Sequence, residues 1–142
     1  MSLIETIVRF ARAVPARRVL LAEAAWNLML ARAVIRWRPF RHAIGFGAIP
    51  LGFRRAINSG AFVSAVETVA ARAPWRSVCF DQSLAVQRAL RRRGQDARLH
   101  YGLTAPNEGP LEAHVWIVLD GRTILGGEHA GAHQPVAVFP AT

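Results

Sequence analysis

The middle of the chain carries the stretch Arg76-Ser77-Val78-Cys79-Phe80-Asp81-Gln82-Ser83-Leu84-Ala85-Val86, where turn-forming residues give way to a helical pattern. Its cysteine is the only one in the 142-residue sequence, so it cannot form a disulfide within the chain. At the start of a helix, unpaired backbone N–H groups and the positive end of the helix dipole favour thiolate over thiol. Cys79 is therefore either a nucleophile or a small buried hydrophobic residue.

Helical patterns lie on both sides of this cysteine. We expect the Cys79 helix to run from Cys79 to Arg93, with arginines in its last turn and Gly94 as its C-terminal cap. Upstream, apolar residues recur at three- and four-residue steps over 3–14, 19–37 and 61–73, which predicts further helices. The apolar run 43–53 is interrupted by glycines and a proline, so we expect a connector there.

Downstream of the Cys79 helix the pattern changes to strands. Residues 97–101 alternate, and 113–119 are strong β formers. Asp120-Gly121 is a hairpin signal that leads into a third strand over 122–125, and 136–139 add a short fourth strand. Helices followed by an antiparallel sheet predict an α+β fold. The length predicts a single domain over 1–142, with a helical N-terminal region over 1–60 and a core over 61–142.

The second predicted strand carries a histidine that is a natural partner for Cys79. A period of two puts His114 and Trp116 on one face and Val115 on the other, so the His114 face must look toward the Cys79 helix if the pair is catalytic. In such a pair the thiolate attacks a carbonyl carbon, the histidine moves the proton, and a third polar group orients the imidazole. The Cys79 backbone N–H is the natural first oxyanion donor, and the Trp75 N–H or a side chain near it is a candidate for the second.

The charge of the chain is strongly positive. All 18 basic residues are arginines, and they outnumber nine acidic residues to give a net charge of +9. Charge alone does not choose among an acidic peptide, a protein, a nucleic acid and a membrane surface. Residues 1–14 carry charges inside their apolar pattern, unlike a signal peptide, and the run 43–53 is too short to span a bilayer. We expect a cytoplasmic protein, with neither nucleic acid nor a membrane as its partner.

Four segments, in this order, resemble one known family. They are Arg36-Trp37-Arg38-Pro39-Phe40-Arg41, Cys79-Phe80-Asp81-Gln82-Ser83-Leu84, Leu90-Arg91-Arg92-Arg93-Gly94, and Ala113-His114-Val115-Trp116 followed by Asp120-Gly121-Arg122. Over residues 20–139 the chain resembles the lasso-peptide biosynthesis B2 family, the transglutaminase-like cysteine leader peptidases. The resemblance implies a papain/transglutaminase-like catalytic core over 61–142, in which Cys79 and His114 cleave the leader from a ribosomally made precursor peptide. It also implies a separate leader-binding B1 protein, an ATP-dependent lasso cyclase and no cofactor.

The residue that orients His114 departs from the pattern of that family. Many members carry an aspartate twelve residues after the histidine, where this chain has Gly126. Asp120 is the nearest acid, but in a two-residue hairpin it lies six residues from His114, roughly 20 Å at about 3.3 Å per residue. The same register places Gly127 opposite His114, so a bulge could turn Glu128 inward. Glu128, Asp120 and a backbone or water group stay open as the orienting group.

Other polar and aromatic residues have more ordinary roles. Asp81 and Gln82 fall in the first turn of the Cys79 helix, where we expect them to act in capping. Trp116 and Trp75 are candidates for the wall of the substrate site. A pair of histidines, His129 and His133, does not predict a metal site, because the glycine between them indicates a loop.

Two further functions are compatible with the same residues. A transglutaminase-like acyltransferase would use Cys79 and His114 but pass the acyl group to an amine in place of water. A non-catalytic, basic peptide-binding module would account for the arginines and leave Cys79 without a chemical role.

Overall fold

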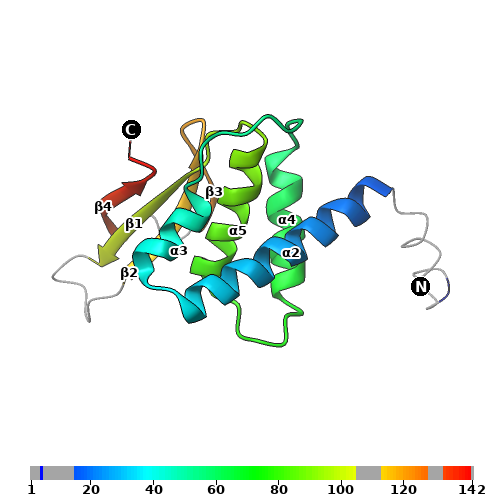
Figure 1. Cartoon of the computed structure of the whole chain (residues 1–142), viewed down its shortest axis with the longest axis horizontal. Coiled ribbons are helices and arrows are strands. Elements are labelled where there is room, and N and C mark those ends of the chain that lie inside the picture. Colours follow the sequence, from blue (N-terminus) through cyan, green and yellow to red (C-terminus); the bar gives the residue numbers. More distant parts are fainter. Residues whose placement is uncertain (1–3, 5–14, 105–112, 128–132, 142) are drawn as a thin grey trace.

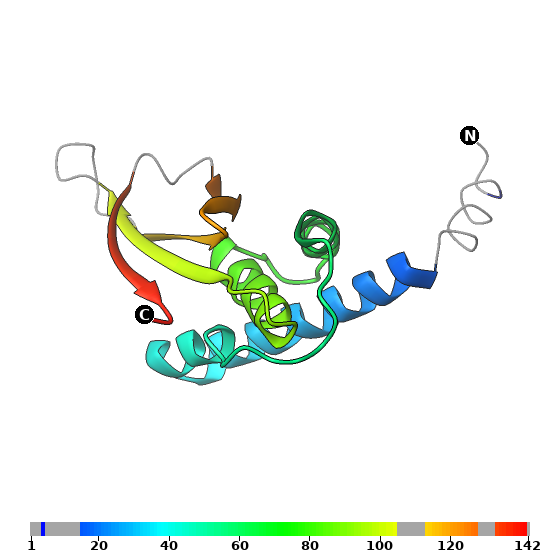
Figure 2. The same cartoon turned by 90° about the horizontal axis from the view of Figure 1, so that it is seen from above.

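The computed structural model describes residues 4, 15–104, 113–127 and 133–141, and the structural statements below refer to these residues. The helices are α2 (Pro15–Trp37), α3 (Phe40–Gly47), α4 (Ser59–Ala70) and α5 (Cys79–Arg92). The strands are β1 (Arg98–Thr104), β2 (Ala113–Leu119), β3 (Arg122–Leu125) and β4 (His133–Phe139). The strands form an antiparallel sheet in the order β3-β2-β1-β4, and the helices lie together beside it (Figures 1 and 2). This confirms the predicted α+β fold.

The central helix of this arrangement is α5. It contacts α2, α3 and α4, and it also packs on β1 and β2. The core between these elements is built from fully buried apolar side chains of α2, α4, α5 and the sheet: Leu28, Phe62, Leu84, Leu90, Leu99 and Ile117. Each such side chain stabilises the fold by about 1.5–3 kcal/mol relative to an exposed position. The start of α5 is therefore placed against the sheet by apolar packing along the rest of the helix.

The sequence predicts several element boundaries correctly. The bounds of β2 and β3 are as expected, and α5 begins at Cys79. Asp120 and Gly121 both have positive φ, 52° and 77°, as the tight hairpin turn between β2 and β3 requires. β1 continues beyond its predicted end to Thr104, and β4 begins at His133, earlier than predicted.

The predicted connector over 43–53 is wrong in its first part, because residues 40–47 form helix α3. Pro39 precedes the helix with φ −60°, and Ala43 and Ile44 bury their side chains in the core. A Cβ atom at Gly47 would overlap the side-chain amide of Gln87 on α5. This glycine therefore allows close packing of two helices and does not end a segment as a turn former would.

The carbonyl end of α5 is closed by backbone N–H groups. Gly94, with φ 73°, donates its N–H to the Arg91 oxygen at 3.0 Å, and the N–H of Gln95 donates to the Leu90 oxygen at 3.0 Å. This pair of bonds is a Schellman motif and confirms Gly94 as the C-terminal cap. The connector after α3 adds another bond, from the Gly52 N–H to the Arg91 oxygen at 2.7 Å.

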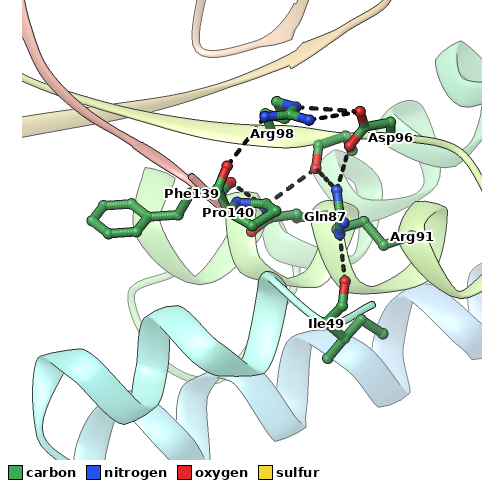
Figure 3. Close-up of polar contacts among 8 residues, drawn as sticks. Ile49, Gln87, Arg91, Asp96, Arg98, Phe139 and Pro140 are labelled. Carbon is green, nitrogen blue, oxygen red and sulfur yellow. Dashed lines mark hydrogen bonds and ion pairs between the residues drawn. The ribbon is translucent and has the colours of Figure 1, made fainter. Parts of the chain in front are cut away.

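A buried guanidinium fastens the same end of α5 to its neighbours (Figure 3). Arg91 is only 5% exposed, and its Nε donates to the Ile49 carbonyl at 2.5 Å. Its Nη1 donates to the Asp96 carboxylate at 2.5 Å and to the Ala97 carbonyl at 3.2 Å. One side chain thus joins the connector after α3 to the chain that leads into β1.

The side-chain amide of Gln87 extends this network to the last strand. Its Nε2 donates to the Ala97 carbonyl at 3.2 Å and to the Phe139 carbonyl at 2.8 Å (Figure 3). Arg98 donates to the Asp96 carboxylate at 3.0 Å and to the Pro140 carbonyl at 3.3 Å. The end of β4 and the connector after α3 are therefore both bonded to α5.

None of the described helices has the length and apolar content needed to cross a membrane.

Candidate active site

Cys79 and His114 lie side by side although 35 residues separate them. Cys79 is the first residue of α5, and His114 is the second residue of β2. The Cys79 Sγ atom is 3.5 Å from His114 Nδ1, a distance at which a thiol and an imidazole can exchange a proton. Both residues are half-buried. The structure thus brings together the two residues that the sequence predicts as nucleophile and base.

The start of α5 at Cys79 depends on the carboxylate of Asp81. Val78 precedes the helix in an extended conformation, with φ −112° and ψ 171°. Asp81 is 1% exposed and accepts the backbone N–H groups of Val78 at 2.9 Å and Gln82 at 3.0 Å. These bonds confirm the capping role predicted for Asp81, while Gln82 takes part through its backbone N–H. The carboxylate therefore determines where the helix begins and hence where Cys79 stands.

The same carboxylate also holds the segment that precedes the helix. The Ser77 hydroxyl donates to both Asp81 oxygens at 3.1 Å, and the Trp75 indole N–H donates to one of them at 3.2 Å. The indole N–H of Trp75 is thus bonded to Asp81, and Trp75 as the second oxyanion donor stays a prediction. Sequence reasoning did not find this network, because nothing local links Trp75 to a residue six positions later. A substrate-binding role for Trp75 stays a prediction.

His114 reaches Cys79 from the very start of its strand. Val115, Ile117 and Leu119 point into the core shared with α5, so by alternation His114 and Trp116 belong to the other face. The requirement that the whole His114 face look toward the helix was therefore wrong. His114 stands where β2 begins, beside the first residue of α5, and this position brings its ring to the sulfur.

The face of the sheet that carries His114 is partly covered by aromatic rings. Trp116 is 4% exposed, and its ring centroid lies 5.7 Å from that of His100 on β1. Burial, and then the positive charge of Arg98, lower the pKa of His100, which keeps this imidazole neutral near pH 7. Trp116 as part of the substrate-site wall stays a prediction.

No acidic side chain could replace Gly126 without strain. Gly126 has φ 77°, and a Cβ atom there would lie 2.9 Å from the Val115 oxygen and 3.1 Å from the Trp116 Cβ. A side chain at this position would therefore need both an unfavourable backbone conformation and a shift of β2. The structure therefore leaves no room for a side chain at the position where the resembling family carries its aspartate.

The other candidates for orienting His114 lie at different places. Asp120 is exposed in the turn at the far end of β2, six residues from His114, so the structure does not bring the two together. A bulge in the β2–β3 pairing puts Leu125 opposite Ile117, so the simple register that placed Gly127 opposite His114 does not continue past Val118. Glu128 lies outside the described residues.

Metal ligands do not gather in the part of the chain that the structure describes: it contains no group of three His, Cys, Asp or Glu residues that could hold an ion. His129 lies outside the described residues, and the side chain of His133 is likewise not described.

Comparison with known proteins gives the family. Residues 24–138 match the model of the Transglutaminase-like superfamily. No curated protein and no solved structure matched the chain. Because the family match covers well over half of the chain, the protein belongs to the transglutaminase-like superfamily. Its Cys79–His114 pair is the arrangement of a cysteine hydrolase or acyltransferase.

Proposed function

We propose that this protein is a cysteine leader peptidase that acts in lasso-peptide biosynthesis. The observation that carries the proposal is the contact of Cys79 Sγ with His114 Nδ1 at 3.5 Å, at a helix start in a transglutaminase-like domain. The order of the four sequence motifs supports the choice of a leader peptidase within that superfamily. The net charge of +9 suits a peptide substrate or a partner that carries acidic groups.

The proposed reaction breaks one peptide bond in two steps. His114 takes the proton of the Cys79 thiol, and the thiolate attacks the carbonyl carbon that joins leader to core. The Cys79 backbone N–H, at the start of α5, stabilises the oxyanion. As the peptide bond breaks, His114 gives the proton to the departing amine of the core, and the leader stays on Cys79 as a thioester. Water, deprotonated by His114, then hydrolyses the thioester and restores the thiol.

We propose Glu128 as the residue that orients the His114 imidazole. Its place in the sequence, just after the hairpin strand that pairs with β2, supports this choice. Glu128→Gln should lower kcat by about ten-fold or more without unfolding the protein, because a misoriented base transfers protons poorly. Asp120→Asn is the matched control, since it removes an exposed acid at the far end of the same hairpin. Equal kcat values for the two variants would reject Glu128.

The partners of this reaction are proposed from the same resemblance. A separate leader-binding B1 protein would deliver the precursor peptide, and an ATP-dependent cyclase would close the freed core N-terminus onto a side-chain carboxylate. We propose that these steps take place in the cytoplasm.

The test is mass spectrometry of a lasso precursor peptide incubated with the protein and a leader-binding B1 protein. Wild type should release leader and core, whose masses sum to that of the precursor plus one water. Cys79→Ala and His114→Ala should lower release by about a thousand-fold or more. Release that persists in Cys79→Ala would reject the peptidase proposal. In reactions with an added primary amine, a leader–amide product in place of the free acid would favour the acyltransferase.

A further inference from the structure

Three aromatic rings from different elements meet beside the start of α5. Phe40 opens α3, Phe80 is the second residue of α5, and Tyr101 lies on β1. The Phe40 and Phe80 rings stack at 5.7 Å with an interplanar angle of 18°, and Phe40 meets Tyr101 edge-on at 5.9 Å. These separations are typical of attractive aromatic pairs. We call Phe40, Phe80 and Tyr101 the aromatic cluster.

The aromatic cluster lies one residue from the Cys79–His114 pair along two separate elements. On α5, Phe80 directly follows Cys79. On β1, Tyr101 pairs with Val115, the residue that follows His114 on β2, and lies on the face of the sheet that packs against the core. In an extended peptide each residue advances the chain by about 3.3 Å. When a peptide carbonyl carbon lies at the Cys79 sulfur, the side chains one or two residues away on the peptide therefore lie a few ångströms from it. The cluster is therefore within reach of the side chains that flank a reacting carbonyl.

The cluster is only partly covered by the rest of the protein. Phe80 and Tyr101 are half-buried, but Phe40 is 52% exposed. Val78, the residue before Cys79, is 43% exposed and adds apolar surface at the same helix end. Exposed apolar area of this kind gains free energy when another apolar group covers it.

We propose that the aromatic cluster is a binding subsite for a large apolar or aromatic side chain of the peptide substrate, next to the carbonyl that Cys79 attacks. This inference deepens the proposed function and rests on its peptide substrate and on Cys79 as the nucleophile. The subsite selects between substrates because a phenyl ring covers the exposed face of Phe40, whereas a methyl group leaves it in water. Hydrophobic pockets that distinguish side chains by size commonly give ratios of about ten-fold or more.

The test uses three chloromethyl ketone probes, acetyl-Ala-Ala, acetyl-Ala-Phe and acetyl-Phe-Ala, and follows Cys79 labelling by intact-protein mass spectrometry. In this reaction the thiolate forms a thioether and chloride leaves. Wild type should react about ten-fold faster with at least one phenylalanine probe than with the all-alanine probe. Phe40→Ala should bring that ratio close to one, and Phe40→Leu should keep part of it. Labelling by iodoacetamide, which has no side chain to place, should be the same in all variants.

The control variant is Phe53→Ala, which removes a phenylalanine that is fully exposed elsewhere on the surface. It should retain the wild-type ratio. Equal rates for the three probes in wild type, or a ratio that Phe40→Ala leaves unchanged, would overturn the subsite. Because probe labelling needs no leader cleavage, a normal ratio without leader release would instead reject the proposed function alone. Leader release without a probe preference would reject the subsite alone.

Discussion

The two ends of helix α5 differ in their hydrogen bonding and in their exposure to solvent. At its C-terminal end, backbone N–H groups close the helix carbonyls and the buried Arg91 side chain bonds two neighbouring segments. At its N-terminal end, one carboxylate, Asp81, arranges the first turn, and Val78 and Cys79 are left partly open to solvent. The difference teaches that a C-terminal end firmly bonded to its neighbours allows the N-terminal end of α5 to present a thiol and backbone N–H groups to a substrate.

Removing Arg91 should have the largest effect on stability. Arg91→Ala leaves the Ile49 and Ala97 carbonyls without this donor and Asp96 without one of its two arginines. We expect the free energy of unfolding to fall by about 3 kcal/mol, measured by urea denaturation. The iodoacetamide rate at Cys79 in the folded protein should not change, because the other end of the helix is untouched. Arg92→Ala, at a half-exposed neighbour, is the control, and an equal loss there would contradict the role of Arg91.

Removing the charge of Asp81 should affect both stability and reactivity. In Asp81→Asn, the amide NH₂ group faces N–H and O–H groups that donate hydrogen bonds to the carboxylate in wild type. The segment 75–78 therefore loses some of its hydrogen bonds to α5. We expect a loss of about 2 kcal/mol in urea denaturation and a several-fold change in the iodoacetamide rate at Cys79. Glu67→Gln, an exposed acid on α4, should change neither. An Asp81→Asn protein that is destabilised but reacts at the wild-type rate would show that the network does not position Cys79.

The smallest expected effect is a pH dependence of the stability that Asp96 contributes just beyond the C-terminal end of α5. Hydrogen bonds from Arg98 and Arg91 lower the pKa of Asp96 in the folded protein. A lowered folded-state pKa stabilises the fold above the unfolded pKa of about 3.9, and this contribution is lost as the pH falls through the folded value. Because the Asp96 side chain is 42% exposed, we expect less than about 1 kcal/mol. Urea midpoints should show wild type above Asp96→Asn at pH 7, and the gap should narrow at pH 3; a constant gap would contradict the ion pairs.

Features determined by neighbouring residues were predictable from the sequence. The Asp120-Gly121 turn requires two positive φ angles, which is a property of those two residues and defines the ends of β2 and β3. Gly94 closes α5 for the same kind of reason. Cys79 and His114 could be predicted as a nucleophile and its base because few residue types have this chemistry. The structure brings the two side chains together.

Features that depend on packing between distant segments were not predictable. Helix α3 contains glycines that look like breaks in the sequence, yet Gly47 is required by the close approach of Gln87. The aromatic cluster joins residues 40, 80 and 101, which share no periodicity because they come from two helices and a strand. The Trp75–Asp81 bond likewise follows from the course of the chain before α5.

The rate of Cys79 alkylation by iodoacetamide at pH 7 tests the central claim most directly. It is compared in wild type, in His114→Ala and in the urea-unfolded chain, with Cys79→Ala as the blank. If the helix start and His114 together activate the thiol, folded wild type reacts at least about ten-fold faster than the unfolded chain, and His114→Ala loses most of that advantage. Equal rates in wild type and His114→Ala, both at or below that of the unfolded chain, would contradict the assignment of Cys79 as a nucleophile activated by His114.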